Sequence, residues 1–317
     1  MQGIASKSPE NKPVRGQFSL ADSAAYAQWR ERKLAQAPQS AQAISIAIAD
    51  LACPSQVEKA AIIDACSKAN MAIYRIARPA SEAAIRSALK CFAAALGLSG
   101  MEDHRSAAGD GIVAITPSDK EEKERYIPYS NRPLSWHTDG YYNYHGPDNC
   151  IRGMLLHCVR NASSGGENAF LDPEIAYIRL RDLNPDYIAA LMHPQAMTIP
   201  PGEGAGGKPR PANSGPVFAV DPADGSLIMR FTERKRHIIW RDDAATIEAV
   251  QTLYRILQDE PCILRKRLEP GEGIVCNNVL HARTAFDPNR NEDANRLLYR
   301  VRYKNVVGAQ SSKARSA

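Results

Sequence analysis

Residues 134–144, LSWHTDGYYNY, have types and spacing that could bind a metal. His137 and Asp139 lie two residues apart in an aromatic-rich segment that favours a strand over 135–142. Side chains two apart on a strand share a face, so an imidazole and a carboxylate there could give two of the three ligands of a non-haem iron site. A surface ion pair or a core histidine is the simpler alternative, because such pairs also arise by chance.

His281 is the candidate for a third ligand. It follows the run NNVL at 277–280 and lies far in sequence from His137. That separation is no objection, because a metal site between packed sheets usually draws its ligands from distant strands. Without a metal, His281 would be a loop histidine beside a polar turn.

The last predicted strand, 295–303, places three arginines on one face. The period of two groups Arg296, Arg300 and Arg302, and the opposite face is apolar: Leu297, Tyr299, Val301 and Tyr303. Guanidinium groups on a buried strand are costly unless anions meet them, and arginine binds a carboxylate through two parallel hydrogen bonds. The pattern therefore predicts a dicarboxylate bound beside the metal. An edge strand with its arginines in water is the alternative.

Length and composition indicate a soluble globular chain of 317 residues, 44% hydrophobic and 24% charged. The net charge of +5 suits a small anionic substrate, and no long basic block indicates nucleic acid. The seven cysteines are scattered without a C-x-x-C pair, which argues against disulfides and structural zinc. No apolar run is long enough for a signal or a membrane span, so the expected location is cytoplasmic.

The elements that must position these residues are expected in one domain, 18–307, between flexible tails at 1–17 and 308–317. Its first part, 18–110, is a mixed α/β support. There the expected helices are 19–36, 55–70 and 81–96, and the expected strands are 43–49 and 71–77.

The second part, 111–307, is a β-rich core with lid insertions. Its expected elements are strands 111–116, 135–142, 151–159, 168–171 and 295–303, hairpins 216–232 and 262–277, and helices 172–181, 184–192 and 243–259. The lid candidates are the polar residues 118–125 and the Gly- and Pro-rich residues 200–216. The composition of 200–216 is unsuited to strands or helices, so this segment is expected to be either a lid or disordered.

Several motifs form a set in chain order. They are His-Thr-Asp at 137–139, Gly-Gly at 165–166, a Pro-Gly turn at 270–271, Asn-x-x-x-His-x-Arg-x-x-Phe at 277–286 and Arg-x-x-x-Arg at 296–300. Over residues 130–303 the set resembles the taurine dioxygenase (TauD/TfdA-like) family of iron(II)- and 2-oxoglutarate-dependent oxygenases. The resemblance implies an α+β chain with a mainly β core, a double-stranded β-helix (jelly roll) flanked by helices.

The same resemblance implies roles for the motif residues. His137, Asp139 and His281 would bind iron(II). Arg300 would pair with the distal carboxylate of the cosubstrate 2-oxoglutarate, while Arg296 would lie near the end that chelates iron or near the O2 site.

Two asparagines are further candidates for binding the cosubstrate. Relatives often have Thr or Ser after the Gly-Gly pair, where this chain has Glu167 and Asn168. Asn168 can still donate a hydrogen bond to a carboxylate, and Asn131 is also expected to face the cosubstrate.

The implied activity is hydroxylation of a small, charged organic substrate, with O2 consumed and succinate and CO2 released. The Asp139 carboxylate fits hydroxylation, because halogenating relatives lack it. The alternative is a non-catalytic jelly-roll protein that binds a metal or a small carboxylate. A metal-dependent hydrolase is disfavoured, since no second metal site or general-base motif is found. The expected partners are a small-molecule substrate and, if the chain forms a homo-oligomer, its own copies, with neither nucleic acid nor membrane.

The substrate candidates follow the metal motif or lie in a basic stretch. Tyr141, Tyr142 and Tyr144 could form an aromatic wall for a quaternary ammonium, or they could pack the sheet. Arg230, the first arginine of the basic stretch 230–241, could bind a sulfonate or carboxylate, or it could belong to a solvated basic face.

Overall fold

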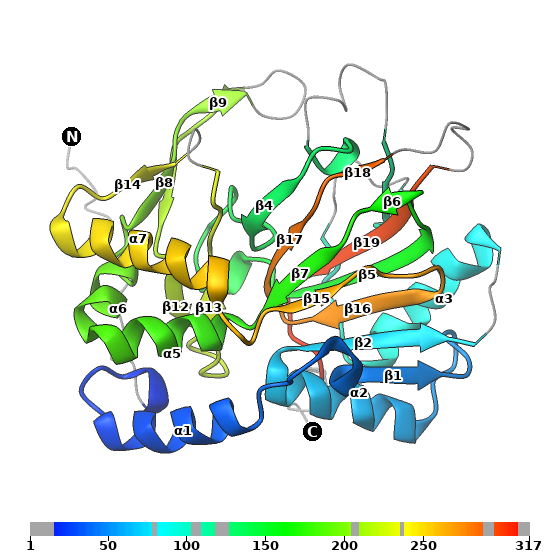
Figure 1. Cartoon of the computed structure of the whole chain (residues 1–317), viewed down its shortest axis with the longest axis horizontal. Helices are drawn as coiled ribbons and strands as arrows, with labels where there is room; N and C mark the ends of the chain where they lie inside the picture. Colours follow the sequence, from blue (N-terminus) through cyan, green and yellow to red (C-terminus); the bar gives the residue numbers. More distant parts are fainter. Residues whose placement is uncertain are drawn as a thin grey trace, which may run out of the picture.

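The computed structural model describes residues 16–77, 81–102, 109–117, 127–203, 209–234, 238–287 and 295–309. Its centre is two sheets, one of six strands and one of four (Figure 1). In spatial order the larger sheet contains β1 (Ser45–Ile48), β2 (Met71–Ile76), β16 (Glu272–Cys276), β5 (Gly153–Arg160), β19 (Leu297–Tyr303) and β3 (Val113–Ile115). The smaller sheet contains β15 (Leu264–Lys266), β7 (Asn168–Leu171), β17 (Leu280–Arg283) and β4 (Leu134–His137).

The two sheets pack face to face around a shared apolar core. Met154 and Leu156 of β5 and Ile274 of β16 contact the same cluster as Phe170 of β7 and Leu264 of β15. Alternation along each strand directs these side chains between the sheets. Apart from the parallel pair β1 and β2, the strands pair antiparallel, as the predicted jelly roll requires.

The first part of the chain does more than cover a sheet, because β1 and β2 are themselves strands of the larger sheet. The helices α2 (Gln56–Ala69) and α3 (Glu82–Ala95) cover its outer face. A capping box starts α2, where Ser55 and Glu58 exchange hydrogen bonds, as the sequence Ser-x-x-Glu at 55–58 favours. The helix ends at Asn70, whose φ of 56° is left-handed and directs the chain straight into β2.

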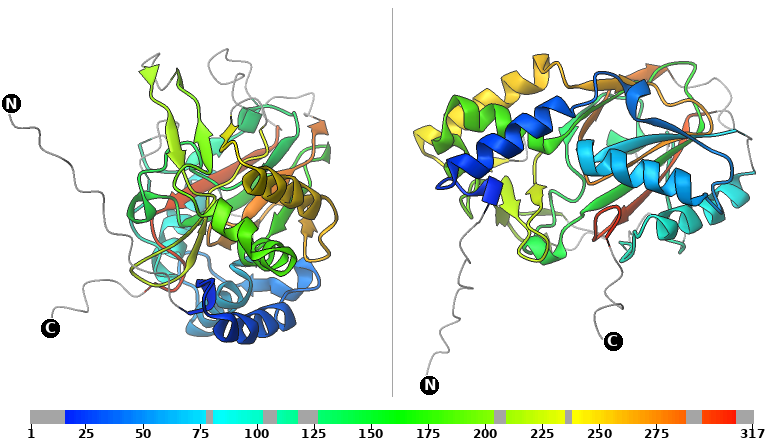
Figure 2. Two further views of the ribbon diagram at one scale, coloured as in Figure 1. Left: turned by 90° about the vertical axis from the view of Figure 1, so that its left-hand side faces the viewer. Right: turned by 90° about the horizontal axis from the view of Figure 1, so that it is seen from below.

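A second group of helices packs at one end of the sheets (Figure 1): α1 (Ser23–Ala35), α5 (Pro173–Leu183), α6 (Pro185–Leu191) and α7 (Ala244–Asp259). Seen from below, α1 and α2 cover the underside of the molecule (Figure 2). Asp172, Asn184 and Asp243 cap the first turns of α5, α6 and α7, so these helices begin within one residue of the predicted positions. Among the described residues, no helix combines the length and the apolar character needed to cross a membrane.

One predicted hairpin is wrong and one is confirmed. The strands β15 and β16 do not pair, because β15 lies beside β7 in the smaller sheet and β16 lies between β2 and β5 in the larger one. The turn between them therefore carries the chain from one layer to the other. The hairpin within 216–232 forms as β12 (Phe218–Val220) and β13 (Leu227–Met229).

Residues 200–216 contain more regular structure than predicted. Short strands β9 (Gly202–Glu203), β10 (Pro209–Arg210) and β11 (Asn213–Gly215) form there, and β11 pairs with β8 (Met197–Ile199), which also pairs with β14 (Ile239–Trp240). A further short pair is β6 (Ser164–Gly165) with β18 (Phe286–Asp287). Residues 204–208, the lid candidate 118–125, and the predicted tails except 16–17 and 308–309 lie outside the described residues.

Candidate metal centre

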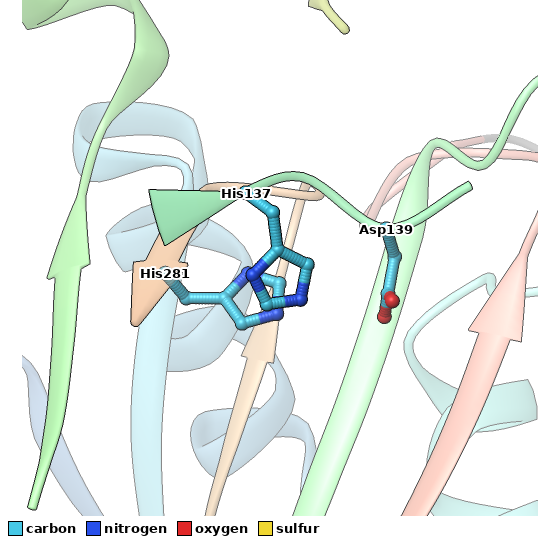
Figure 3. A group of neighbouring side chains, drawn as sticks. All are labelled: His137, Asp139 and His281. Atoms are coloured by element: carbon cyan, nitrogen blue, oxygen red, sulfur yellow. The ribbon is translucent and has the colours of Figure 1, made fainter. Parts of the chain in front are cut away.

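The two candidate histidines face each other on neighbouring strands. His281 of β17 is directly opposite His137 of β4 in the antiparallel register, and their ring centroids are 4.1 Å apart (Figure 3). Each Nδ1 lies 2.9 Å from a backbone carbonyl oxygen, that of Ser135 for His137 and that of Val279 for His281. A carbonyl can only accept, so Nδ1 carries the proton and Nε2 keeps a lone pair for a metal.

Asp139 reaches the histidines from a loop, not from a strand, so the predicted strand over 135–142 is wrong beyond His137. Beyond His137 the chain leaves β4, and Thr138 forms hydrogen bonds with Phe231, which follows β13. Its N–H donates to the carbonyl of Phe231, and its side-chain oxygen accepts from the Phe231 N–H. Potential ligand atoms of the three residues nevertheless all lie within 4.8 Å of one another.

The Asp139 carboxylate is held on one side only. Its Oδ1 accepts hydrogen bonds from Nη1 of Arg300 at 3.1 Å and Nη1 of Arg302 at 3.4 Å. Burial would raise the pKa of Asp139, but these two cations outweigh it and hold the pKa below its ordinary value. The buried Oδ2 has no hydrogen-bond partner among the residues the structure describes.

The triad has the electrostatic character that a divalent metal requires. Burial, followed by the neighbouring His281, lowers the pKa of His137 to about 3, and burial likewise lowers the pKa of His281. Both imidazoles are therefore neutral and able to bind a metal. Two Nε2 lone pairs and the unpaired carboxylate oxygen of Asp139 form a two-histidine, one-carboxylate donor set, which fits iron(II).

A cleft that is partly open to solvent extends from the histidines between the sheets. Arg283 and Arg296 line it and are buried. Burial lowers the pKa of Arg283 to about 9, with a smaller effect from Arg296, and burial lowers the pKa of Arg296 to about 10. Within the described part of the chain, neither Nε has a hydrogen-bond partner, although Nη2 of Arg283 donates to the carbonyls of Ser130 and Arg132. Two such cations form a site for an anion.

This cleft therefore has a metal end and a basic end. Arg283 lies two residues beyond His281 on β17, so their side chains are about 7 Å apart on one face. Asn168 of β7 is opposite Arg283 in the register and also lines the cleft. The guanidinium carbons of Arg283 and Arg296 lie 4.7 and 5.2 Å from the centre of the Phe286 ring, which places these two cations together.

The sequence matches the family described as "Taurine catabolism dioxygenase TauD, TfdA family" over residues 39–302. The chain belongs to the TauD/TfdA family. A similar protein is a uridine-5'-phosphate dioxygenase from Amycolatopsis sp, 30% identical over 187 residues, which cover 56% of this chain and 62% of that protein. The match thus spans less than two thirds of its relative.

Solved structures place this TauD/TfdA chain in the expected fold. Asparagine oxygenase in complex with Fe(II), 2S,3S-3-hydroxyasparagine and succinate superposes with a TM-score of 0.56 at 15% identity, covering 84% of this chain and 94% of that one. The non-heme iron oxygenase OrfP in complex with Fe and alpha-ketoglutaric acid gives a TM-score of 0.58 at 18% identity, covering 82% of both chains. The predicted α+β jelly roll is confirmed.

In this TauD/TfdA chain the arginine face of β19 is buried, so the edge-strand alternative is wrong. The strand lies between β5 and β3, and Arg296, Arg300 and Arg302 are all buried. The structure places Arg300 at the metal end, against Asp139, and Arg296 at the basic end. The resemblance instead implies that Arg300 pairs with the distal carboxylate of the cosubstrate and that Arg296 lies near its iron-chelating end or the O2 site.

The two candidate asparagines occupy different environments. Asn168 is buried and lines the basic end of the cleft, where its amide is 3.4 Å from the carbonyl of Lys266. Asn131 is exposed, and its recorded contact is through the backbone, whose carbonyl accepts from the Phe286 N–H at 3.1 Å. Asn168 thus lines the cleft, and Asn131 is not among the residues that line it.

The three candidate tyrosines do not form one wall. Tyr141 lies edge-on to His137, with ring centroids 6.3 Å apart, and Tyr142 is exposed with its hydroxyl 3.3 Å from Nη2 of Arg302. Both border the metal end. Tyr144 instead packs tightly against Gly215, below the guanidinium of Arg230. Tyr144 therefore has a packing role, which was the alternative to an aromatic wall for the substrate.

The guanidinium of Arg230 bonds to the protein itself, and the alternative of a solvated basic face is wrong for this residue. It is buried, and its five N–H groups all point at oxygen atoms of the surrounding segments. The acceptors are the carbonyls of Tyr141, Met197, Gly215 and Asn213 and the side-chain oxygen of Asn213. Arg230 therefore joins the loop after β4 to β8 and β11. Residues 235–237 of the same basic stretch lie outside the described residues.

Replacing Arg230 by methionine should therefore lower the free energy of unfolding by about 3 kcal/mol, because several buried carbonyls lose their donors. Urea denaturation measures this loss. A stable variant with a raised KM for substrate would instead restore Arg230 to the substrate site.

Arg283 and Asn278 had no role predicted from the sequence. Arg283 stands in the quoted motif and shares the face of His281 two residues earlier, so strand periodicity could have identified it. Asn278 gave no signal, because its importance depends on a left-handed φ of 48° and on hydrogen bonds to residues more than a hundred positions away.

Proposed function

We propose that the protein is an iron(II)- and 2-oxoglutarate-dependent dioxygenase that hydroxylates a small anionic organic molecule. The observation that carries the proposal is the unpaired, buried Oδ2 of Asp139 beside two neutral imidazoles. A carboxylate oxygen without a partner in a buried site costs free energy unless a cation meets it. Family membership and the fold of iron oxygenases support the same conclusion.

Bound iron would supply activation of O2, coupled to conversion of 2-oxoglutarate to succinate and CO2. His137, Asp139 and His281 would hold that metal. The residues of the basic end would orient the cosubstrate, with Arg296 and Arg283 binding its distal carboxylate and Asn168 donating a hydrogen bond. The distance of about 7 Å along β17 from His281 to Arg283 suits a five-carbon dicarboxylate that reaches the metal with its other end.

The charges around the cleft favour an anionic substrate. The described arginines there outnumber the described carboxylates: Arg283, Arg296, Arg300 and Arg302 against Asp139 and Glu102. The two positive charges of iron(II) and the two negative charges of 2-oxoglutarate would cancel. The excess positive charge of the arginines would therefore remain to attract an anionic substrate. The name of the Amycolatopsis relative, a dioxygenase of uridine-5'-phosphate, supports a phosphate ester as one substrate class to test.

Anaerobic titration of the apoprotein with iron(II) and 2-oxoglutarate tests the metal site directly. We expect a weak visible charge-transfer band that requires both additions and disappears in His137→Ala. His145→Ala is the matched control, because His145 is exposed and bonded to Asn143 away from the cleft. A folded protein without the band would contradict the proposed site.

Succinate release in air then tests turnover. Nucleoside monophosphates and small carboxylates are the first substrates to screen, and we expect at least one to accelerate succinate formation. A charge-transfer band with no acceleration by any anionic compound would favour the non-catalytic jelly-roll binding protein instead.

A further inference from the structure

Two adjacent asparagines follow β16 and bond in different directions. Asn277 bonds to the supporting layer: its backbone N–H donates to the Asn70 carbonyl at 2.8 Å, and its Nδ2 donates to Oδ1 of Asn70 at 3.0 Å. Its Oδ1 accepts from the Val307 N–H at 2.9 Å. Asn277 thus joins the end of α2 to the C-terminal segment.

Asn278 bonds instead to the loop that carries Asp139. Its Oδ1 accepts from the Asp139 N–H at 2.8 Å, and its Nδ2 donates to the Asp139 carbonyl at 3.1 Å and to the Ile151 carbonyl at 2.8 Å. The side chain is buried, with 7% of its surface exposed. The amide thereby fixes the backbone on both sides of the Asp139 side chain.

Such fixation matters because Asp139 lies beyond the end of β4, where the strand ladder no longer holds the backbone. Its carboxylate is also attracted by Arg300 and Arg302, which both approach Oδ1. A looser loop would let the carboxylate turn further toward these cations and take Oδ2 away from the histidines. We propose that Asn278 is a positioning residue that keeps Oδ2 of Asp139 directed at the metal; this inference rests on the proposed function.

The residue type fits that role. Asn278 has a φ of 48°, a left-handed value that asparagine and glycine tolerate better than other residues. A carboxamide also offers both an acceptor and two donors, and Asn278 uses all of them. Glycine would keep the backbone and lose the three hydrogen bonds. Aspartate would keep the acceptor but set an oxygen against the two carbonyls.

Titration of the full-length apoprotein with cobalt(II), without 2-oxoglutarate, tests the proposal, because cobalt(II) d–d absorption reports the geometry of the ligands. We expect Asn278→Gly to raise the cobalt(II) Kd about tenfold, as is typical for residues that orient metal ligands, and to change the d–d spectrum. Asn278→Asp should bind still more weakly. Asn277→Ala, the matched control, should lower the melting temperature but leave the Kd within about twofold of wild type.

Three results would overturn the inference. Wild-type affinity and spectrum in Asn278→Gly would show that the carboxylate needs no such support. Equal losses of cobalt(II) affinity in Asn277→Ala and Asn278→Gly would overturn the specific role of Asn278, because they would show only general destabilisation. Failure of the wild-type protein to bind cobalt(II) would overturn the proposed metal site and this inference with it. This result is distinct from the first two, because it appears in the wild type, whereas a failure of the Asn278 inference alone appears only in the variants.

Discussion

Replacing Asp139 by asparagine should abolish 2-oxoglutarate turnover, with a loss of at least about a thousandfold in succinate formation. The amide has nearly the same shape but no charge, and the carboxylate is the one anionic ligand of the proposed two-histidine, one-carboxylate site. The change also removes the buried carboxylate that faces Arg300, whereas Arg302 keeps its ion pair with Glu102. We therefore expect the free energy of unfolding of the apoprotein to fall by about 3 kcal/mol.

A second buried ion pair provides the matched control. Asp221 pairs with Arg152 beside the hairpin of β12 and β13, and it is not among the residues lining the cleft. Asp221→Asn should lose a similar amount of stability in urea denaturation but keep the iron(II) affinity of the wild type. Iron(II) affinity near the wild-type value in Asp139→Asn would remove Asp139 from the ligand set.

The sequence could identify the metal candidates but not how the fold brings them together. His137 and Asp139 were grouped by strand alternation, yet β4 ends at His137 and Asp139 is placed by a loop. The two side chains are still close together although the predicted strand is a loop beyond His137, because residues two apart can also lie on one side of a tight loop. Asn278 and Phe231 hold this loop from distant parts of the chain, and no local pattern encodes such contacts.

Elements with local causes were predicted well. The starts of α2, α5, α6 and α7 lie within one residue of the predicted positions, because each depends on a capping side chain within one turn. The alternation of β19 likewise identified both its arginine face and its apolar face, and the apolar residues pack in one cluster. The pairing of β15 with β7 rather than β16 depends instead on which layer each strand joins, and a turn signal does not contain that information.

The role of each arginine was the least predictable part of the site. Arg230, Arg296 and Arg300 are chemically identical, and all three are buried. Their roles differ because Arg230 meets backbone carbonyls, Arg300 meets Asp139, and Arg296 lines the cleft near Arg283. Only the register of the strands determines which neighbour each one finds.

Replacing Arg296 by methionine should raise the KM for 2-oxoglutarate about a hundredfold, which corresponds to about 3 kcal/mol. The distal carboxylate would lose a buried guanidinium partner. The free energy of unfolding of the apoprotein should stay unchanged or rise, because a buried cation whose pKa is lowered by burial is replaced by an apolar chain of similar length. Steady-state kinetics and urea denaturation measure the two effects.

Two further variants give this test its discrimination. Arg181 is also buried, and it donates to the carbonyls of Gln17 and Ser19 far from the cleft, so Arg181→Met should lose stability and keep the wild-type KM. Arg300→Met should act through Asp139 and lower iron(II) affinity and kcat more than it changes the KM for 2-oxoglutarate. If Arg300→Met raises that KM and Arg296→Met does not, the assignment made from the sequence is correct, and the arginine at the metal end must release Asp139 to bind the cosubstrate.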